Sequence, residues 1–202
     1  MATMVSNADK TFKVTVGNTK GVSSSQATGV SYGYAQVEPN HLSAQRTGAI
    51  YAQLPCKKDI EVLENGQFVK YDYPEGVVDF TGKGEWMLVF NEVKVYYDRD
   101  TDADFAMKKS NYIARVYGAD NSFMPEDTNM VPRVFKTEIG DIFTTNAVQN
   151  KIEELKKGDT LTVGEDGFLK KEEGASEGMI WQVAKVYTLG DLQPAVKIQR
   201  IQ

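Results

Sequence analysis

A run of four alternating carboxylates offers the most specific chemistry in this sequence. Residues 98–104 read DRDTDAD, and carboxylates spaced along a loop can bind Ca²⁺ through their oxygens. An EF-hand loop starting at Asp98 would need glycine at its sixth position and a bidentate glutamate at its twelfth. These positions hold Ala103 and Lys109. The run therefore predicts a solvated acidic loop, with a cation site as the alternative, and we expect no metal centre.

The single cysteine and the single histidine could form a nucleophile and its base. Cys56 and His41 would also need a third group to orient the histidine and a rigid frame to hold the pair. His41 lies in a polar stretch that offers no such frame, so we predict no catalytic dyad. One cysteine excludes an internal disulfide and a site made of cysteines alone. The sequence holds no histidine cluster for zinc and no Gly-rich phosphate loop before a helix, so we expect no cofactor.

Paired carboxylates and aromatic platforms are the remaining chemical possibilities. A hydrolase with two converging Asp or Glu side chains stays open as an alternative, because spatial pairing cannot be read from a sequence. Trp86 and Trp181 could stack on sugars, but each lies inside an apolar run. Both runs predict strands, so we expect the two tryptophans in the core. We predict that the chain has no catalytic residues.

Short apolar runs and regularly spaced turns predict an all-β protein. The clearest unit is residues 157–171, where Asp166-Gly167 separates two runs and predicts a hairpin. Asn65-Gly66 predicts a second hairpin in the same way. Gly-Asp pairs recur at 140–141, 158–159 and 190–191; there glycine can turn the chain while aspartate accepts from the amides ahead of it. We expect small antiparallel β-barrel or sandwich units with at most one short helix and an extended N-terminal arm.

Individual elements follow from the same patterns. Residues 86–90, WMLVF, form the longest apolar run in this part of the chain and predict a central strand. Residues 112–117 and 195–201 predict further strands. Asn146 and Gln149 have the spacing of a capping box and predict the single helix, which Gly158 would end.

The N-terminal region has a different composition from the rest. Residues 1–50 are rich in Ser, Thr, Gly and Asn and cannot bury enough apolar surface to order themselves, so they predict an extended arm. We expect a first β unit at 51–125 and a second at 126–202, or one continuous domain at 51–202. The arm is either a loose tail or a segment that orders on a partner, with the TFKVTV run adding a strand to it. The candidate contact residues are its alternating apolar residues and two tyrosines: Phe12, Val14, Val16, Tyr32 and Tyr34.

Charge is divided unevenly between these parts. The net charge is −5; residues 1–56 carry four Lys/Arg and two Asp/Glu, and residues 57–202 carry the other nineteen and twenty-six. An acidic body argues against nucleic acid as a partner, because phosphate binding needs a basic face. The sequence has no apolar run long enough to cross a membrane and no secretory signal, so we expect synthesis in the cytoplasm and no membrane partner.

Three stretches resemble the small β domains of tailed-phage capsid decoration, or cement, proteins and related head-stabilising virion proteins. They are GDIFTTNAV at 140–148, GDTLTVGEDGFLKK at 158–171 and MIWQVAKVYTLGDLQPAVKIQRI at 179–201. The preceding residues 54–97 are similar to phage structural proteins of unassigned role, so the likeness covers about residues 54–201. The family brings no catalytic motif, and no functional residue is carried over from it.

The resemblance implies a virion structural protein on the exterior of the capsid, made in the host cytoplasm. Such a protein stabilises the shell by binding across major capsid protein subunits, and other copies of the chain are a further expected partner. The alternative, from a different functional class, is a head- or tail-fibre module that binds a host surface or carbohydrate. Both readings expect protein or glycan contacts and no chemistry.

Overall fold

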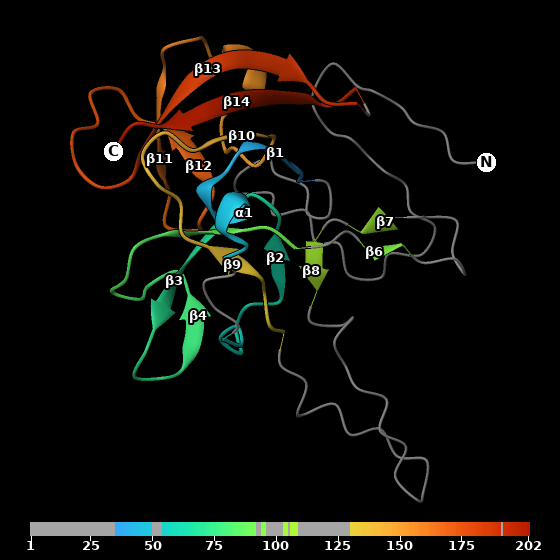
Figure 1. The fold of residues 1–202 in the computed structure, drawn as a ribbon, viewed down its shortest axis with the longest axis vertical. Helices are drawn as coiled ribbons and strands as arrows, with labels where there is room; N and C mark the ends of the chain where they lie inside the picture. The colour runs from blue at the N-terminus through green and yellow to red at the C-terminus, as the bar shows by residue number, and fades with distance from the viewer. Residues whose placement is uncertain are drawn as a thin grey trace, which may run out of the picture.

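The computed structural model describes residues 35–49, 54–91, 94–95, 103–104, 106–108, 130–190 and 192–202. These residues form a mostly β structure with one short α-helix, which confirms the predicted fold class (Figure 1). The expected strand at 112–117 lies outside them. The strands are β1 (Val37–His41), β2 (Val62–Glu64), β3 (Phe68–Asp72), β4 (Val77–Asp79), β5 (Met87–Val89), β6 (Lys94–Val95), β7 (Ala103–Asp104), β8 (Ala106–Lys108), β9 (Val134–Phe135), β10 (Ile142–Thr145), β11 (Thr160–Val163), β12 (Leu169–Lys171), β13 (Ile180–Thr188) and β14 (Pro194–Arg200). The helices are α1 (Ser43–Thr47) and the 3₁₀ turn η2 (Ile152–Glu154).

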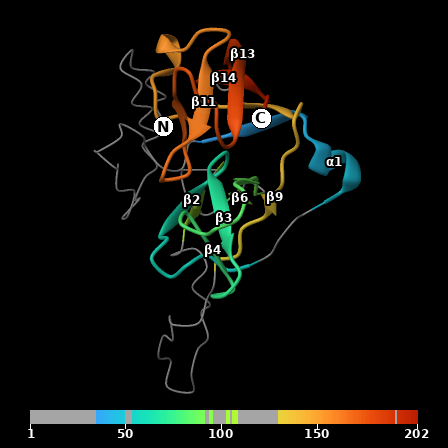
Figure 2. The same ribbon diagram turned by 90° about the vertical axis from the view of Figure 1, so that its left-hand side faces the viewer.

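A six-stranded antiparallel sheet contains the C-terminal strands. Its order is β1-β10-β14-β13-β11-β12, so the long β13–β14 hairpin lies at the centre and each side adds two strands. The last strand of the chain is therefore interior, and Val196 and Ile198 are fully buried. Figure 2 shows β11, β13 and β14 above β3, β4 and β9, which belong to a second, four-stranded sheet.

Two equivalent Gly-Asp turns start the strands on either side of the central hairpin. The Asp141 amide donates to the Glu138 carbonyl and the Asp159 amide to the Lys156 carbonyl, both at 3.0 Å. In each turn the aspartate side chain accepts from the amide three residues before it, at 2.9 Å, and not from amides ahead as predicted. The intervening glycines have φ of 96° and 95°, which explains the residue type.

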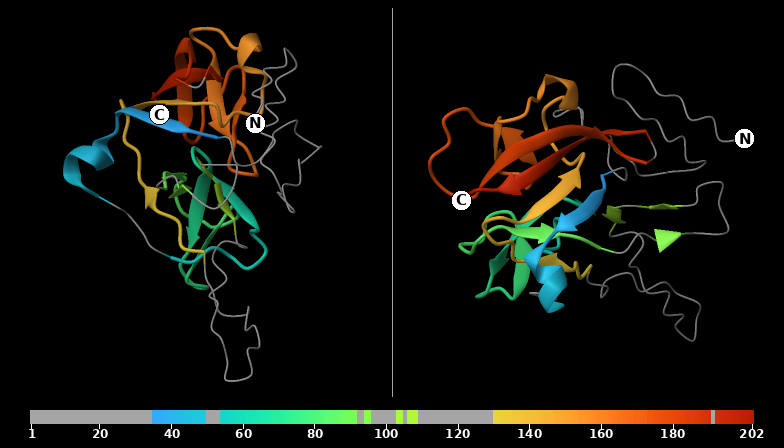
Figure 3. Two further views of the ribbon diagram at one scale, coloured as in Figure 1. Left: turned by 90° about the vertical axis from the view of Figure 1, so that its right-hand side faces the viewer. Right: turned by 45° about the horizontal axis from the view of Figure 1, so that its top comes forward.

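A four-stranded antiparallel sheet, in the order β4-β3-β5-β9, forms the second layer. The predicted central strand at 86–90 is confirmed as β5, which lies between β3 and β9. Two short ribbons, β2 with β8 and β6 with β7, complete the described strands. Figure 3 shows β1 (blue), the edge strand of the six-stranded sheet, continuing into α1.

One predicted hairpin is confirmed and the other is wrong. Asp166-Gly167 joins β11 and β12, in which Val163 pairs with Leu169. Asn65-Gly66 is a turn, but β2 pairs with β8 while β3 pairs with β4 and β5. The turn therefore passes the chain from a ribbon to a sheet, and the distant strand β8 is the pairing partner that local spacing could not reveal.

The helix prediction at 146–158 is also wrong. Only the 3₁₀ turn η2 forms there, because both expected capping residues bind distant groups. Asn146 Oδ1 accepts from the Gln36 amide at 2.8 Å, and Gln149 Nε2 donates to Asp166 at 2.7 Å. The α-helix is α1, which the sequence did not indicate.

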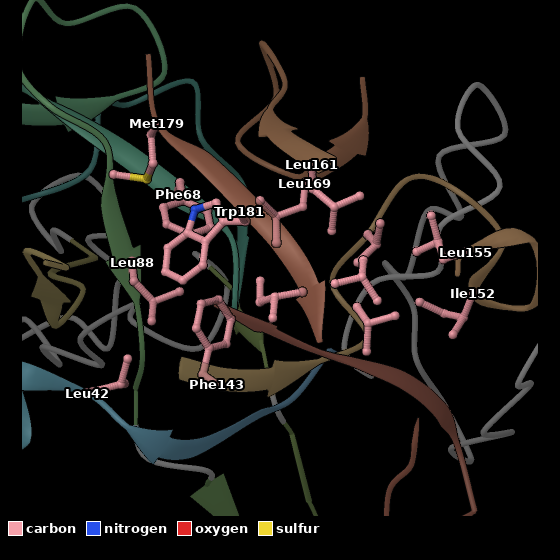
Figure 4. Packing of buried hydrophobic residues seen from close by; sticks show 14 residues of the cluster. Leu42, Phe68, Leu88, Phe143, Ile152, Leu155, Leu161, Leu169, Met179 and Trp181 are labelled. Carbon is pink, nitrogen blue, oxygen red and sulfur yellow. The ribbon is translucent and has the colours of Figure 1, made fainter. Parts of the chain in front are cut away.

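The largest core cluster joins the two sheets. Phe68 of β3 packs against Trp181 of β13 and Phe143 of β10, with ring centroids 5.9 and 6.4 Å away (Figure 4). Trp181 meets Phe143 edge to face at 5.0 Å, and it is fully buried as predicted. Leu88 of β5 belongs to the same cluster. The boundary expected near residue 126 consequently does not divide the core, and β9, which follows it, belongs to the four-stranded sheet.

Residues 35–49 belong to the folded body and not to an arm, so this part of the predicted arm is wrong. β1 pairs with β10 in the six-stranded sheet, and Ala35, Leu42 and Ala44 are buried. Low apolar content concealed this segment because its main partners are backbone and polar side chains. The candidate arm contacts Phe12, Val14, Val16, Tyr32 and Tyr34 lie outside the described residues.

Candidate protein-contact surface

Residues 35 and 36, which precede β1 and enter the folded body formed by the described strands, are hydrogen-bonded to β2 and to the end of β10. Ala35 is fully buried, and its amide donates to Glu64 Oε2 at 3.3 Å. The next residue, Gln36, donates its amide to Asn146 Oδ1 at 2.8 Å and accepts from Thr145 Oγ1 at 2.7 Å. Residues 35 and 36 are therefore tied to buried side chains.

The point where the two sheets meet is closely packed. We call it the sheet junction and define it as residues 66–68, 145–147 and 166–168. The Phe68 amide donates to the Gly167 carbonyl at 2.8 Å, and Gln67 Nε2 donates to the Asp166 carbonyl at 2.6 Å. A Cβ on Gly167 would lie 2.1 Å from the Phe68 carbonyl oxygen, and one on Gly66 would lie 2.6 Å from Thr145 Oγ1. The junction thus tolerates only glycine at these positions and fixes the sheets against each other.

Buried aspartates tie further segments to this frame. Asp141 is 1% exposed, and its Oδ1 accepts from the Ser43 amide at 2.8 Å, which satisfies a free donor at the start of α1. Asp79 is also nearly buried. Burial alone would raise the pKa of Asp79, but hydrogen bonds from Thr81 and from the Gly82 amide, with Lys57 nearby, hold that pKa below its usual value.

Three of the sheet edges are covered or interrupted. Residues 148–150 cover β12: the Gln149 amide donates to the Leu169 carbonyl at 2.8 Å, and the Lys171 amide donates to Asn150 Oδ1 at 2.6 Å. Residues 55–57 cover β4 through a parallel bridge between Cys56 and Val78. The edge strand β1 carries Pro39 and an irregular register after it. These devices hinder the addition of a foreign strand at these three edges, so contacts with other proteins are favoured on another part of the surface.

The outer part of the β13–β14 hairpin is such a surface. We define the outer hairpin as residues 184–197, where β13 has passed the end of its pairing with β11 (Figure 1). Val186 is 40% exposed and Leu192 is 77% exposed at the turn. Leu192 has φ of 69°, and it is the only described non-glycine residue with a positive φ. A bulky residue in this conformation costs about 1–2 kcal/mol.

Two lysines and a tyrosine form a polar cluster on the outer hairpin. Lys185 and Lys197 are direct register partners on neighbouring strands. Their ammonium groups lie 5.9 and 6.0 Å from the centroid of the Tyr187 ring. Like charges directly opposite one another destabilise a sheet, and the ring offsets only part of that repulsion. The hairpin therefore keeps a local concentration of positive charge.

A shallow depression adjoins this cluster. It is lined by apolar and polar side chains of β13, β14 and η2: Ile152, Glu153, Lys185, Val186, Tyr187, Thr188 and Pro194. The hairpin is held over η2, and buried Gln193 near its tip accepts from Asn146 Nδ2 at 2.8 Å. These residues form no motif in the sequence, because only exposure and strand register bring them together.

The two residues considered for a catalytic dyad, Cys56 and His41, lie in different environments. Cys56 is buried in a core cluster of the four-stranded sheet, and burial raises the pKa of its thiol to about 12. A thiol with that pKa stays protonated at neutral pH and is a poor nucleophile. His41 lies exposed at the end of β1. Cys56 and His41 therefore do not form the buried, oriented dyad that catalysis would need.

The structure describes part of the acidic run at 98–104 and the surroundings of Trp86. Of the run at 98–104, only Ala103–Asp104 are described, as strand β7 paired with β6. The described residues contain no group of three or more His, Cys, Asp or Glu side chains that could hold a metal ion. Trp86 is partly buried against the main core, with the Lys70 ammonium 4.4 Å from its ring centroid.

Comparisons with known proteins returned no relative. No protein-family model matches the chain, and neither the curated proteins nor the solved structures contain a significant match. Among the described helices, none is long and apolar enough to span a membrane.

Proposed function

We propose that the chain is a structural protein of a tailed-phage virion that decorates the capsid exterior and stabilises it by binding across major capsid protein subunits. In this role it is made in the host cytoplasm, acts without catalysis or a cofactor, and binds neither nucleic acid nor membrane. The resemblance of residues 140–148, 158–171 and 179–201 to decoration proteins supports the proposal.

The observation that carries the proposal is the anchoring of residues 35 and 36 in the body. A cement protein works only if force on its attached segment reaches a rigid body, and these residues bind buried groups of Glu64, Thr145 and Asn146. Residues 1–34 then serve as the attaching arm, which could span about 110 Å if fully extended. Phe12, Val14 and Val16 supply the strand that adds to the shell, and Tyr32 and Tyr34 are further contact residues.

Attachment at many equivalent sites makes a modest single contact sufficient. A specific interface needs about 1,000 Å² of buried surface. Simultaneous contacts by one molecule, or association with neighbouring copies of the chain, raise the overall affinity without further chemistry. Covered sheet edges on the body fit this role, because they limit unwanted strand exchange between copies crowded on a shell.

Sedimentation with undecorated shells of the phage tests the proposal. The full chain should pellet with shells at a fixed stoichiometry, and a variant lacking residues 2–34 should remain in the supernatant with an unchanged circular dichroism spectrum. Polar replacement of the strand residues (Phe12→Ser, Val14→Ser, Val16→Ser) should release the protein, whereas Val5→Ser, Val22→Ser and Val30→Ser, in the same arm, should not. Unchanged binding of the truncated variant would eliminate the arm, and failure of the full chain to pellet would contradict the proposed function.

A carbohydrate-binding module of a head or tail fibre is the second candidate. Tyr73 favours it: the side chain is 68% exposed in the turn after β3, and its ring centroid lies 5.0 Å from that of Tyr71. An exposed aromatic ring can stack on a sugar face. A glycan array should then give a signal that Tyr73→Ala removes, while the absence of any signal would exclude this candidate.

A further inference from the structure

We propose that the outer hairpin, residues 184–197, is a docking surface for an acidic segment of a partner protein. The segment would place an apolar side chain in the depression beside Tyr187 and carboxylates between Lys185 and Lys197. This goes beyond the proposed function, because it concerns a surface on the body and not the arm.

The first support is that two energetically unfavourable features, a strained backbone conformation and a pair of like charges, both occur in the outer hairpin. Leu192 holds a positive φ while exposing most of its side chain, and the two facing lysines repel each other. Neither arrangement helps the isolated chain to fold. Strained or repulsive arrangements persist where a functional contact relieves or uses them.

The second support is charge complementarity. The outer hairpin carries Lys185 and Lys197 against Asp191, a net charge of +1, while the rest of residues 57–202 carries −8. A partner carboxylate between Lys185 and Lys197 would turn a repulsive pair into two attractive ones. A second copy placed symmetrically would instead bring the two lysine pairs together, which disfavours a twofold self-contact through this surface.

The third support is preorganisation. The hairpin register is fixed on β14, η2 packs beneath it, and Gln193 is tied to Asn146, whose own side chain binds Gln36. A rigid surface loses little conformational entropy when it binds. The adjoining depression gives a protein side chain a defined position, whereas a membrane or a flexible polyanion would use the charge alone.

Amide chemical shifts of the full chain, titrated with a defined probe, test the inference. The probe is an acetylated hexapeptide with a Leu-Phe core flanked by two glutamates on each side, and its control replaces the glutamates with glutamines. Shifts should concentrate in residues 184–197 and around Ile152, and the glutamine peptide should bind about tenfold more weakly. No shifts, shifts centred elsewhere, or equal affinity of the two peptides would overturn the proposal.

Two variants separate recognition from folding. Lys185→Gln with Lys197→Gln should weaken the acidic peptide about tenfold and leave the thermal midpoint unchanged or higher, because it removes a repulsive pair. Lys58→Gln with Lys83→Gln removes the same charge from exposed turn and loop positions outside the outer hairpin and should bind like the original chain. Equal loss in both variants would contradict a specific surface.

Other occupants are tested in the same way. Vesicles of phosphatidylserine or an oligothymidylate that shift the hairpin amides more strongly than the acidic peptide would overturn the assignment to a protein. The peptide readout does not involve shells, so it can fail while the arm still binds them, and it can succeed if the arm does not.

Discussion

The sheet junction and the outer hairpin solve the same backbone problem in opposite ways. Gly167 at the junction and Leu192 at the hairpin tip both have positive φ, of 79° and 69°. At the junction a side chain would collide with the Phe68 carbonyl, so glycine is required. At the tip the Leu192 side chain is mostly exposed, so packing does not require glycine there, and leucine carries the conformational cost. Close packing therefore explains the residue type at Gly167, whereas folding does not explain the residue type at Leu192.

The largest expected effect is at the junction. Gly167→Ala should lower the free energy of unfolding by about 2–5 kcal/mol, because strain at positive φ adds to a collision with backbone. Gly174→Ala is the matched control, since Gly174 has φ of 73° and an open surrounding. It should cost only about 1 kcal/mol. Urea unfolding of both variants measures the difference, and equal losses would mean that the junction is not close-packed.

The next effect concerns the start of α1, directly after β1. Asp141→Ala leaves the buried amide of Ser43 without its acceptor and should cost about 2–3 kcal/mol. Hydrogen exchange should become faster in α1 and β1 before it does in β13. Asp159→Ala, in the equivalent but exposed turn, should cost about 1 kcal/mol or less. A similar loss for the two would show that Asp141 does not hold the start of α1.

Sequence reasoning succeeded where neighbouring residues decide the structure. The Asp166-Gly167 hairpin, strand β5 and the buried Trp181 all follow from local spacing and apolar content. It failed at Asn65-Gly66, where glycine is needed because Thr145 approaches from the other sheet. It failed again at Asn146, whose side chain binds the Gln36 amide and caps no helix.

The candidate surface was missed for a related reason. The pairing of Lys185 with Lys197 depends on the irregular register after Val183, and the positive φ of Leu192 has no sequence signature. β1 was assigned to an arm because polar residues dominate it, although its backbone and side-chain bonds place it in a sheet. Local sequence patterns therefore identify strands. Long-range contacts decide which strand surfaces stay exposed for binding another protein.

A smaller, pH-dependent effect belongs to the four-stranded sheet. The folded-state pKa of Asp79 is lowered, so its stabilisation is present above the unfolded pKa of about 3.9 and is lost as the pH falls through the folded value. Asp79→Asn should cost about 1–2 kcal/mol at pH 7, and the cost should diminish below about pH 4. Unfolding free energies from pH 2 to 7 check this; a cost independent of pH would exclude the carboxylate as its source.

The smallest effect, and the sharpest contrast with the junction, is at the tip. Leu192→Asn should leave stability unchanged or raise it by about 0.5–1 kcal/mol, because asparagine adopts positive φ more readily than leucine. The same variant should bind the acidic peptide more weakly if the exposed leucine is part of the docking surface. A clear loss of stability would instead assign Leu192 to folding.

The central claim is that this protein acts by binding and stabilising another protein. Scanning calorimetry of undecorated shells with and without the full chain tests it most directly. The account predicts that the chain raises the temperature at which the shells disrupt, and that the variant lacking residues 2–34 does not. An unchanged disruption temperature at saturating concentrations of the full chain would contradict it.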